Sequence, residues 1–167
     1  ENLAASIYKQ GEEASRQGDH MTAAQHFLRV AQAAPTATIR PTADYDGATA
    51  LVQLKDWDRA AKALTDCRAN HPNHKLQPEV TKKVAFVYRE AGLLAQAAAE
   101  YERVGSESKD AELQTAALQL AGELHVQAGQ PDQAVAVYRR YVAIFPKPLD
   151  VALETREVYA AAAEAHN

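Results

Sequence analysis

Few residues in this chain have the type and spacing that catalysis or metal binding requires. The single cysteine, Cys67, is a candidate nucleophile, and His71 and His74 lie three residues apart around Pro72 and Asn73. Two histidines at this spacing can hold a transition metal when further ligands are near. The sequence offers no third histidine beside them. We therefore interpret the pair as part of a solvated turn.

Cys67 occupies a position that recurs along the chain and is otherwise apolar. Its equivalents, 37 residues apart, are Val30, Val104 and Tyr141. A free cysteine in such a series packs as a small hydrophobic residue, and a single cysteine cannot form an internal disulfide. We therefore predict a buried packing thiol.

The remaining polar residues form no catalytic pattern. Acidic residues such as Glu13 and Glu112 fall on surface positions or in first helical turns, where they favour the helix dipole. The sequence has no glycine-rich phosphate loop, no Gly-x-Ser-x-Gly elbow and no His-Glu-x-x-His pair. We predict a protein that is not an enzyme, with no catalytic residues, no metal site and no cofactor.

A period of 37 residues predicts the elements that position these side chains. Ala23, Ala60, Ala97 and Ala134 mark the period, and larger apolar residues follow each alanine at i+4 and i+7. Residues at this spacing share one face of an α-helix, and the small residue lets a neighbouring helix approach closely. We expect this face to be buried. The i+4 residues are Phe27, Leu64, Tyr101 and Tyr138.

Turn residues precede each of these helices. Glycine accepts the left-handed conformation that ends a helix, and aspartate caps the next one. Asp19 and Asp56 are such caps, and three of the four repeats end at a proline, which cannot continue a helix. We predict pairs of antiparallel helices. The turn residues are Gly18, Lys55, Gly92 and Gly129, and the prolines are Pro35, Pro72 and Pro146.

This pattern resembles the tetratricopeptide repeat family over residues 4–148. The family has small residues in the first helix of each repeat, and Ala, aromatic and Pro marks in the second. The resemblance implies an all-α fold, a right-handed α-solenoid of antiparallel helix pairs. The marks in the first repeat are Gly11, Gly18, Ala23, Phe27 and Pro35.

Three features of this chain differ from the family pattern. The period is 37 rather than the usual 34 residues. Asp44 and Thr81 stand where the family often has a large residue at the start of the first helix. His125 stands where the repeat packs an aromatic residue, so we expect a core or half-buried histidine.

We predict a single repeat domain over residues 1–167. Residues 148–167 are expected to form a last helix that buries Leu153, Val158 and Tyr159, either as a cap or as part of a fifth repeat. The chain begins at Glu1 rather than methionine, and we expect a fragment of a longer protein. The predicted repeats span approximately residues 2–36, 37–74, 75–108 and 109–147.

Composition narrows the classes of partner. The net charge is −4 and the isoelectric point is near 5.9, which gives no reason to expect nucleic acid. Hydrophobic residues make up 47% of the chain, yet no apolar run is long enough to span a membrane. We expect no nucleic-acid partner and no direct membrane insertion.

The resemblance implies that the first helix of each repeat lines a concave groove for a partner. Three aromatic residues at corresponding or nearly corresponding places, Tyr8, Tyr45 and Phe86, would form a track along it, and aromatic and Arg side chains are common interface anchors. Tyr8 and Tyr45 could equally tuck between helices. The candidate groove residues are Tyr8, Glu12, Arg16, Tyr45, Thr49, Gln53, Lys82, Phe86, Arg89, Gln119 and Glu123.

One known use of the family is disfavoured. Some members hold the C-terminal carboxylate of a chaperone in a clamp of Lys, Asn and Arg. The matching positions here are mostly acidic or neutral, and acids would repel a carboxylate. These positions carry Tyr8, Glu12, Asp46, Glu79 and Lys83.

The sequence supports two hypotheses from different classes. The first is a scaffold or adaptor that binds another protein or a peptide segment in the groove. The alanine-rich repeats are similar to those of multi-repeat proteins of Gram-negative cell envelopes, which favours envelope assembly and the periplasm. The alternative is an architectural spacer or self-association segment of a larger protein, forming a homo-oligomer through exposed repeat edges.

Overall fold

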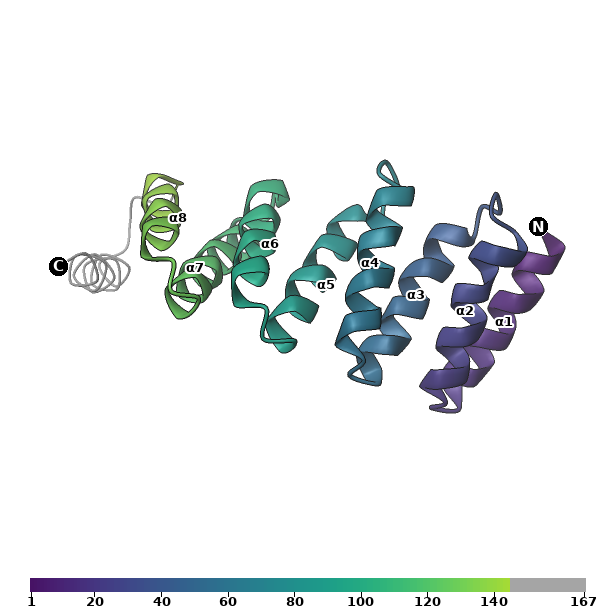
Figure 1. The fold of residues 1–167 in the computed structure, drawn as a ribbon. Helices are drawn as coiled ribbons and strands as arrows, with labels where there is room; N and C mark the ends of the chain where they lie inside the picture. The colour runs from purple at the N-terminus through teal and green to yellow at the C-terminus, as the bar shows by residue number, and fades with distance from the viewer. Residues whose placement is uncertain (145–167) are drawn as a thin grey trace. The chain divides into compact units, whose positions relative to one another are not determined.

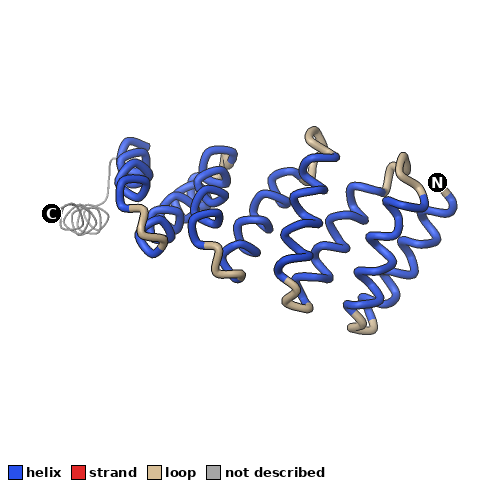
Figure 2. The backbone as a smooth tube through the Cα atoms, viewed as in Figure 1, coloured by secondary structure: helices blue, strands red, loops and turns tan. Residues whose placement is uncertain are grey.

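The computed structural model describes residues 1–144, and within that range the chain is helical, with no β-strand (Figures 1 and 2). The all-α solenoid class predicted from the sequence is confirmed. The predicted helix 148–167 and Pro146 lie outside the described residues. The helices are α1 (Asn2–Arg16), α2 (His20–Ala33), α3 (Arg40–Gln53), α4 (Trp57–Asn70), α5 (Gln77–Glu90), α6 (Leu94–Glu107), α7 (Ala111–Gln127) and α8 (Pro131–Ile144).

The chain divides into two compact units. The N-terminal unit, Glu1–Ala91, contains α1 to α5, and the C-terminal unit, Gly92–Asn167, contains α6 to α8 in its described part. The boundary falls inside the third predicted repeat, between α5 and α6. Within the N-terminal unit α1 packs on α2, α2 on α3, α3 on α4 and α4 on α5, and within the C-terminal unit α7 packs on α6 and α8.

The turns between helices have the backbone geometry that the sequence predicts. Gly18, Gly92 and Gly129 all have positive φ, and so does Lys55, with φ of 56°. Lys55 is the only described non-glycine residue in this conformation, which crowds its Cβ against the following carbonyl.

Lys55→Gly is therefore expected to raise the free energy of unfolding by about 0.5 to 1 kcal/mol, because glycine adopts positive φ without this crowding. Urea denaturation measures the change. Gly18→Ala is the matched control, since a Cβ there meets no atom within 4 Å and only backbone strain at φ of 76° remains. The control should lower the free energy of unfolding. If Lys55→Gly also lowered it, the lysine side chain would contribute more stability than its positive φ costs.

Asp19 and Asp56 act as N-caps, as predicted. The Asp19 carboxylate accepts a hydrogen bond from the Thr22 backbone N–H at 3.0 Å, and Asp56 accepts one from that of Arg59 at 3.3 Å. Each satisfies a donor that the first helical turn leaves without an intrahelical partner. These caps fix where α2 and α4 begin.

The repeating apolar face forms the core. The four marker alanines are fully buried, and the i+4 residues Phe27, Leu64 and Tyr138 are buried. Tyr101 is partly buried against the core of the C-terminal unit. Each marker alanine lets the neighbouring helix approach closely. No described helix combines the length and the apolar character that crossing a membrane requires.

Candidate functional site

Cys67 lies in the core, as its register predicts. The residue is 2% exposed, and its thiol donates a weak hydrogen bond to the Pro41 carbonyl at 3.8 Å. Burial raises the pKa of the Cys67 thiol to about 11. Because the thiolate is the nucleophile, this environment suppresses its reactivity.

Cys67 is therefore expected to react with a disulfide reagent at neutral pH only as fast as the N-terminal unit opens. The urea-unfolded chain should react at once. Since the folded chain holds the proton to a higher pH, this group's stabilisation is present below the ordinary thiol pKa of about 8.5 and is lost as the pH rises toward 11. A fast reaction in the absence of denaturant would contradict the buried position.

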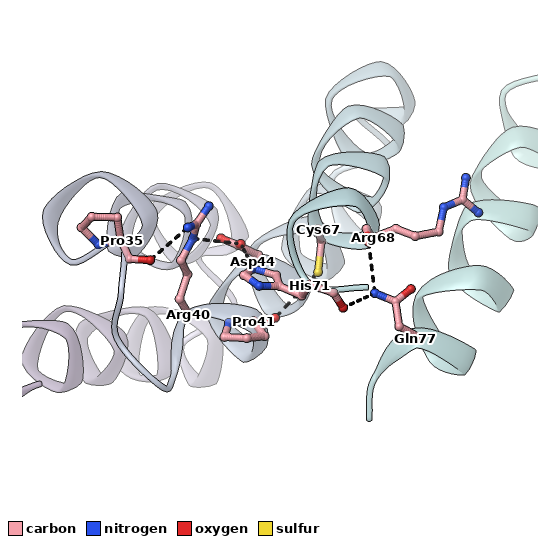
Figure 3. Close-up of polar contacts among 8 residues, drawn as sticks. All are labelled: Pro35, Arg40, Pro41, Asp44, Cys67, Arg68, His71 and Gln77. Carbon is pink, nitrogen blue, oxygen red and sulfur yellow. Dashed lines mark hydrogen bonds and ion pairs between the residues drawn. The ribbon is translucent and has the colours of Figure 1, made fainter. Parts of the chain in front are cut away.

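His71 does not lie in a solvated turn, and that interpretation of the sequence is wrong. Its Nε2 lies 2.9 Å from Asp44 Oδ2, and the two side chains are 13% and 9% exposed (Figure 3). His74 is half-buried, and its Nδ1 accepts a hydrogen bond from the Leu76 backbone N–H at 3.3 Å. Within residues 1–144, no group of His, Cys, Asp and Glu side chains is placed to hold a metal ion.

Arg40, Asp44 and His71 form a partly buried polar cluster, which we call the Asp44 cluster (Figure 3). Arg40 Nε lies 3.6 Å from Asp44 Oδ2, and Arg40 Nη1 donates to the Pro35 carbonyl at 3.0 Å. Gln77 Nε2 donates to the His71 carbonyl at 2.5 Å. The cluster thus joins the α2–α3 connection, α3, the end of α4 and the start of α5.

The sequence carried a signal for the Asp44 cluster. Asp44 replaces the large residue that the family often has at this position, and Arg40 precedes it by four residues, which places both on one helix face. The partner His71 is 27 residues away, and only the packing of α4 on α3 brings it near.

His125 is a core histidine, as predicted. Its Nε2 lies 2.8 Å from Glu102 Oε1, and its Nδ1 lies 2.9 Å from Gln130 Oε1. Glu102 also accepts a hydrogen bond from Arg140 Nη1 at 2.7 Å. Glu102 therefore links α6 to both α7 and α8 within the C-terminal unit, which gives this cluster a structural role.

The main concavity among the predicted groove residues lies in the N-terminal unit, and we call it the inner hollow. Its volume is about 490 Å³. Residues of α1 and α3 form its walls, and α2 contributes to its floor. The lining residues are Tyr8, Glu12, Ser15, Arg16, His20, Phe27, Asp46, Thr49, Ala50 and Gln53.

Tyr8 combines the two roles that the sequence left open. Its ring lies 5.1 Å from that of Phe27, centroid to centroid, and its hydroxyl donates to Asp46 Oδ2 at 2.5 Å. A Cβ on Gly11 would lie 2.7 Å from the Phe27 ring, so a larger residue there would displace this ring. Tyr8 therefore packs on the core with one face and lines the inner hollow.

Charged groups beside the inner hollow come from α3 and α5. Lys83 Nζ donates to Thr49 Oγ1 at 2.9 Å and lies 4.5 Å from the centroid of the Tyr45 ring. Burial lowers the pKa of the Lys83 ammonium. Burial also raises the pKa of the Asp46 carboxyl, against the opposing effects of the Tyr8 hydrogen bond and the Lys83 charge.

The structure brings five of the predicted groove residues together. Tyr8, Glu12, Arg16, Thr49 and Gln53 line the inner hollow. Asp46 and Phe27 also line the hollow but were not among the predicted groove residues. In the sequence, Asp46 is a mismatch to the chaperone clamp, and Phe27 has the register of a core residue.

The other predicted groove residues of the N-terminal unit lie outside this lining. Tyr45 is half-buried beneath Lys83, and Lys82 pairs with Glu79 at 2.9 Å. The Phe86 ring contacts Trp57 edge to face, with centroids 6.3 Å apart, and the Arg89 guanidinium lies 5.5 Å from its centroid. Of the predicted aromatic track, only Tyr8 lines the inner hollow.

Gln119 and Glu123 lie on α7 in the C-terminal unit. Gln119 lines a separate hollow of about 360 Å³ with Ala111, Glu112, Thr115 and Ala116. Glu123 is exposed on the same helix.

Two family models describe parts of this chain, and both are of the tetratricopeptide repeat. One matches residues 43–74 and the other residues 115–165. No curated protein matches the chain as a relative.

Solved structures with the same fold have low sequence identity. A tetratricopeptide repeat protein from Parabacteroides merdae is 15% identical, with a TM-score of 0.67 over 99% of this chain and 64% of that chain. This chain therefore spans less than two thirds of that protein. MamA from Desulfovibrio magneticus, residues 41 to the end, is 17% identical, with a TM-score of 0.65 over 99% of this chain and 92% of that chain.

A third similar structure is pilF from Pseudomonas aeruginosa, which is 16% identical, with a TM-score of 0.57 over 92% of this chain and 66% of that chain. These structures share the helical repeat fold. Together with the 37-residue period, the helix pairs and the two family matches, they identify the chain as a member of the tetratricopeptide repeat family.

Proposed function

We propose that this chain is a non-catalytic scaffold that holds a segment of a protein partner in the inner hollow. Tetratricopeptide repeats form scaffolds for protein–protein interaction, and this chain shares that general role. The observation that carries the finer proposal is the hollow itself, where five groove residues predicted from the sequence surround one concavity of about 490 Å³.

The chemistry of the inner hollow suits a peptide segment. Phe27 and Ala50 give it an apolar floor, and the exposed side chains of Glu12, Ser15 and Gln53 lie on its rim. An apolar base with a few polar groups around it is the usual composition of a binding pocket. The polar rim offers hydrogen bonds that fix the register of an extended or helical segment.

The non-catalytic part of the proposal rests on the state of the candidate reactive groups. Cys67 is buried, with its thiol pKa raised to about 11. The side chains of His71 and His125 are engaged with Asp44 and Glu102 in the interior of their units. None of these groups faces the inner hollow.

The proposal includes a role in assembly at a bacterial cell envelope. Its support is the similarity of the alanine-rich repeats to multi-repeat proteins of Gram-negative envelopes. Fractionation of the native protein tests this part separately. Recovery with the periplasm or membranes is the expected result, and recovery in the cytosol would contradict it.

Peptide selection tests the binding proposal. The full chain is used to select binders from a random peptide library, and the affinity of the selected peptides is measured by fluorescence polarisation. Gln53→Trp places a large side chain at the rim of the inner hollow, and Gln133→Trp makes the same change at an exposed position on α8. Circular dichroism confirms that both variants fold.

Gln53→Trp is expected to weaken binding at least about tenfold, and Gln133→Trp to leave it unchanged. Equal binding by both variants would overturn the proposed site. A failure to select any peptide would do so as well.

Self-association is the second candidate function, and exposed apolar side chains favour it. Leu3, near the start of α1, is 58% exposed, and Ile144, at the end of α8, is 45% exposed. Exposed apolar edges promote association of repeat arrays. Sedimentation over a range of concentrations tests it: a rising mass that Leu3→Glu or Ile144→Glu abolishes supports self-association, and a constant monomer mass rejects it.

A further inference from the structure

We propose that the inner hollow recognises a cationic side chain, lysine or arginine, of the partner segment. This inference rests on the proposed binding site and names the chemistry of its occupant. Its support is the two carboxylates in the lining, the ion pair that already engages Arg16, and the Tyr8 ring beside them.

Two carboxylates line the inner hollow without an ion-pair partner. The Glu12 carboxylate is exposed and has no hydrogen-bond or ion-pair partner among the described residues. Asp46 accepts a hydrogen bond from the neutral Tyr8 hydroxyl, and no Lys or Arg of the described chain lies within ion-pair distance of it. Both carboxylates therefore have acceptor capacity left for a ligand.

Asp46 in particular has no direct ion-pair partner among the described residues, although the Lys83 charge acts on it from a distance. Burial raises its pKa, so the ionised carboxylate is poorly stabilised where it stands. Lys83 is the nearby cation, but its ammonium is directed to Thr49 Oγ1 and the Tyr45 ring. An incoming ammonium or guanidinium would supply a direct ionic partner through a charge-assisted hydrogen bond.

The arginine that lines the inner hollow already has an ion-pair partner. Arg16 Nη2 lies 3.0 Å from Glu13 Oε2, and the Arg16 side chain is 72% exposed. Its charge is therefore paired with a residue outside the lining and is largely screened by water. The half-buried Asp46 is screened less than the exposed Arg16 and Glu12, so its charge is the one that a ligand in the hollow meets most strongly.

The half-buried Tyr8 ring fits the rest of a lysine or arginine side chain. The ring lines the hollow and is supported from the core by buried Phe27, with ring centroids 5.1 Å apart. The methylene stem of a long cationic side chain packs on such a surface while its charged end reaches polar groups. A cation over an aromatic face gains further attraction.

The experiment uses the selected peptides, and we expect them to share a lysine or arginine. Replacing arginine with citrulline, or lysine with norleucine, removes the charge and keeps nearly the same shape. We expect this change to weaken binding at least about tenfold, because Asp46 would lose its buried ionic partner.

Variants of the chain test the same contact from the other side. Asp46→Asn keeps an acceptor for the Tyr8 hydroxyl and removes the charge, so we expect a loss of about tenfold. Glu12→Gln changes a carboxylate on the exposed rim, so it should lower the peptide affinity less than Asp46→Asn does. It should also reduce the salt dependence of binding. Asp66→Asn is the matched control, an exposed aspartate on α4 outside the lining, and should have no effect.

Asp46→Asn should also lose the discrimination between the cationic peptide and its neutral analogue. Peptides that bind in the inner hollow but contain no basic residue, or bind Asp46→Asn as well as the unchanged chain, would overturn the inference and leave the proposed binding site intact. Binding that survives Gln53→Trp would overturn the site and the inference together.

Discussion

Leu64→Ala is expected to lower the free energy of unfolding of the N-terminal unit by about 3 kcal/mol. Leu64 is fully buried on α4, in the cluster that contains Phe27, Leu51 and Val84. Replacing it removes apolar contacts and leaves a cavity that the surrounding helices fill only in part. The effect is large because this leucine belongs to the repeating face on which the helices of the unit pack.

Trp57 makes this prediction easy to measure. It is the only tryptophan of the chain and lies at the start of α4, so its fluorescence reports unfolding of the N-terminal unit in urea. Leu3→Ala is the matched control, because Leu3 is 58% exposed and its loss should change stability by less than about 0.5 kcal/mol. Equal effects of the two substitutions would contradict the core assignment.

Asp44→Ala is expected to lower the free energy of unfolding by about 2 to 3 kcal/mol. The substitution removes the carboxylate that lies 3.6 Å from Arg40 Nε and 2.9 Å from His71 Nε2, and breaking a partly buried ionic pair costs far more than breaking an exposed one. The expected loss is below that for a fully buried pair because the Arg40 side chain is partly exposed.

Asp66→Ala is the control for this second prediction. Asp66 and Lys62 form an exposed ion pair at 2.7 Å on α4, and such pairs contribute about 0 to 1 kcal/mol. Denaturation of both variants in urea, monitored by Trp57 fluorescence, gives the comparison. A cost for Asp44→Ala no larger than that for Asp66→Ala would show that the Asp44 cluster is not a structural element.

The helical architecture could be predicted because it depends on local sequence signals that recur. The marker alanines, the i+4 apolar residues and the positive-φ turns are each set by neighbours within a few residues. Lys55 shows the strength of the pattern: the turn keeps its left-handed residue even where glycine is absent. The same signals placed Cys67 and His125 in the interior correctly.

The Asp44 cluster could not be predicted from local signals. His71 comes directly after a helix and before a proline, which is typical of a solvated turn. Its burial depends on a carboxylate 27 residues earlier in the sequence, on another helix. A polar residue at a normally apolar repeat position was the available clue, and it identified Asp44 but not its partner.

The candidate groove could be predicted only in part, for a similar reason. The resemblance named residues of α1 and α3, and Tyr8, Glu12 and Thr49 among them line one hollow. The resemblance could not show that Lys83 would contact Thr49 and Tyr45. Nor could it show that Asp46 would accept a hydrogen bond from the Tyr8 hydroxyl. Those contacts depend on side-chain reach across neighbouring helices.

The location of bound peptide tests the central proposal most directly. Backbone amide spectra of the isotope-labelled chain are recorded with and without a selected peptide. We predict that the largest changes fall on the residues of α1 and α3 that line the inner hollow, including Glu12, Thr49 and Gln53, and that α7 and α8 change little. Changes centred on the C-terminal unit, or on exposed residues of α4 such as Lys62, would contradict the proposed site.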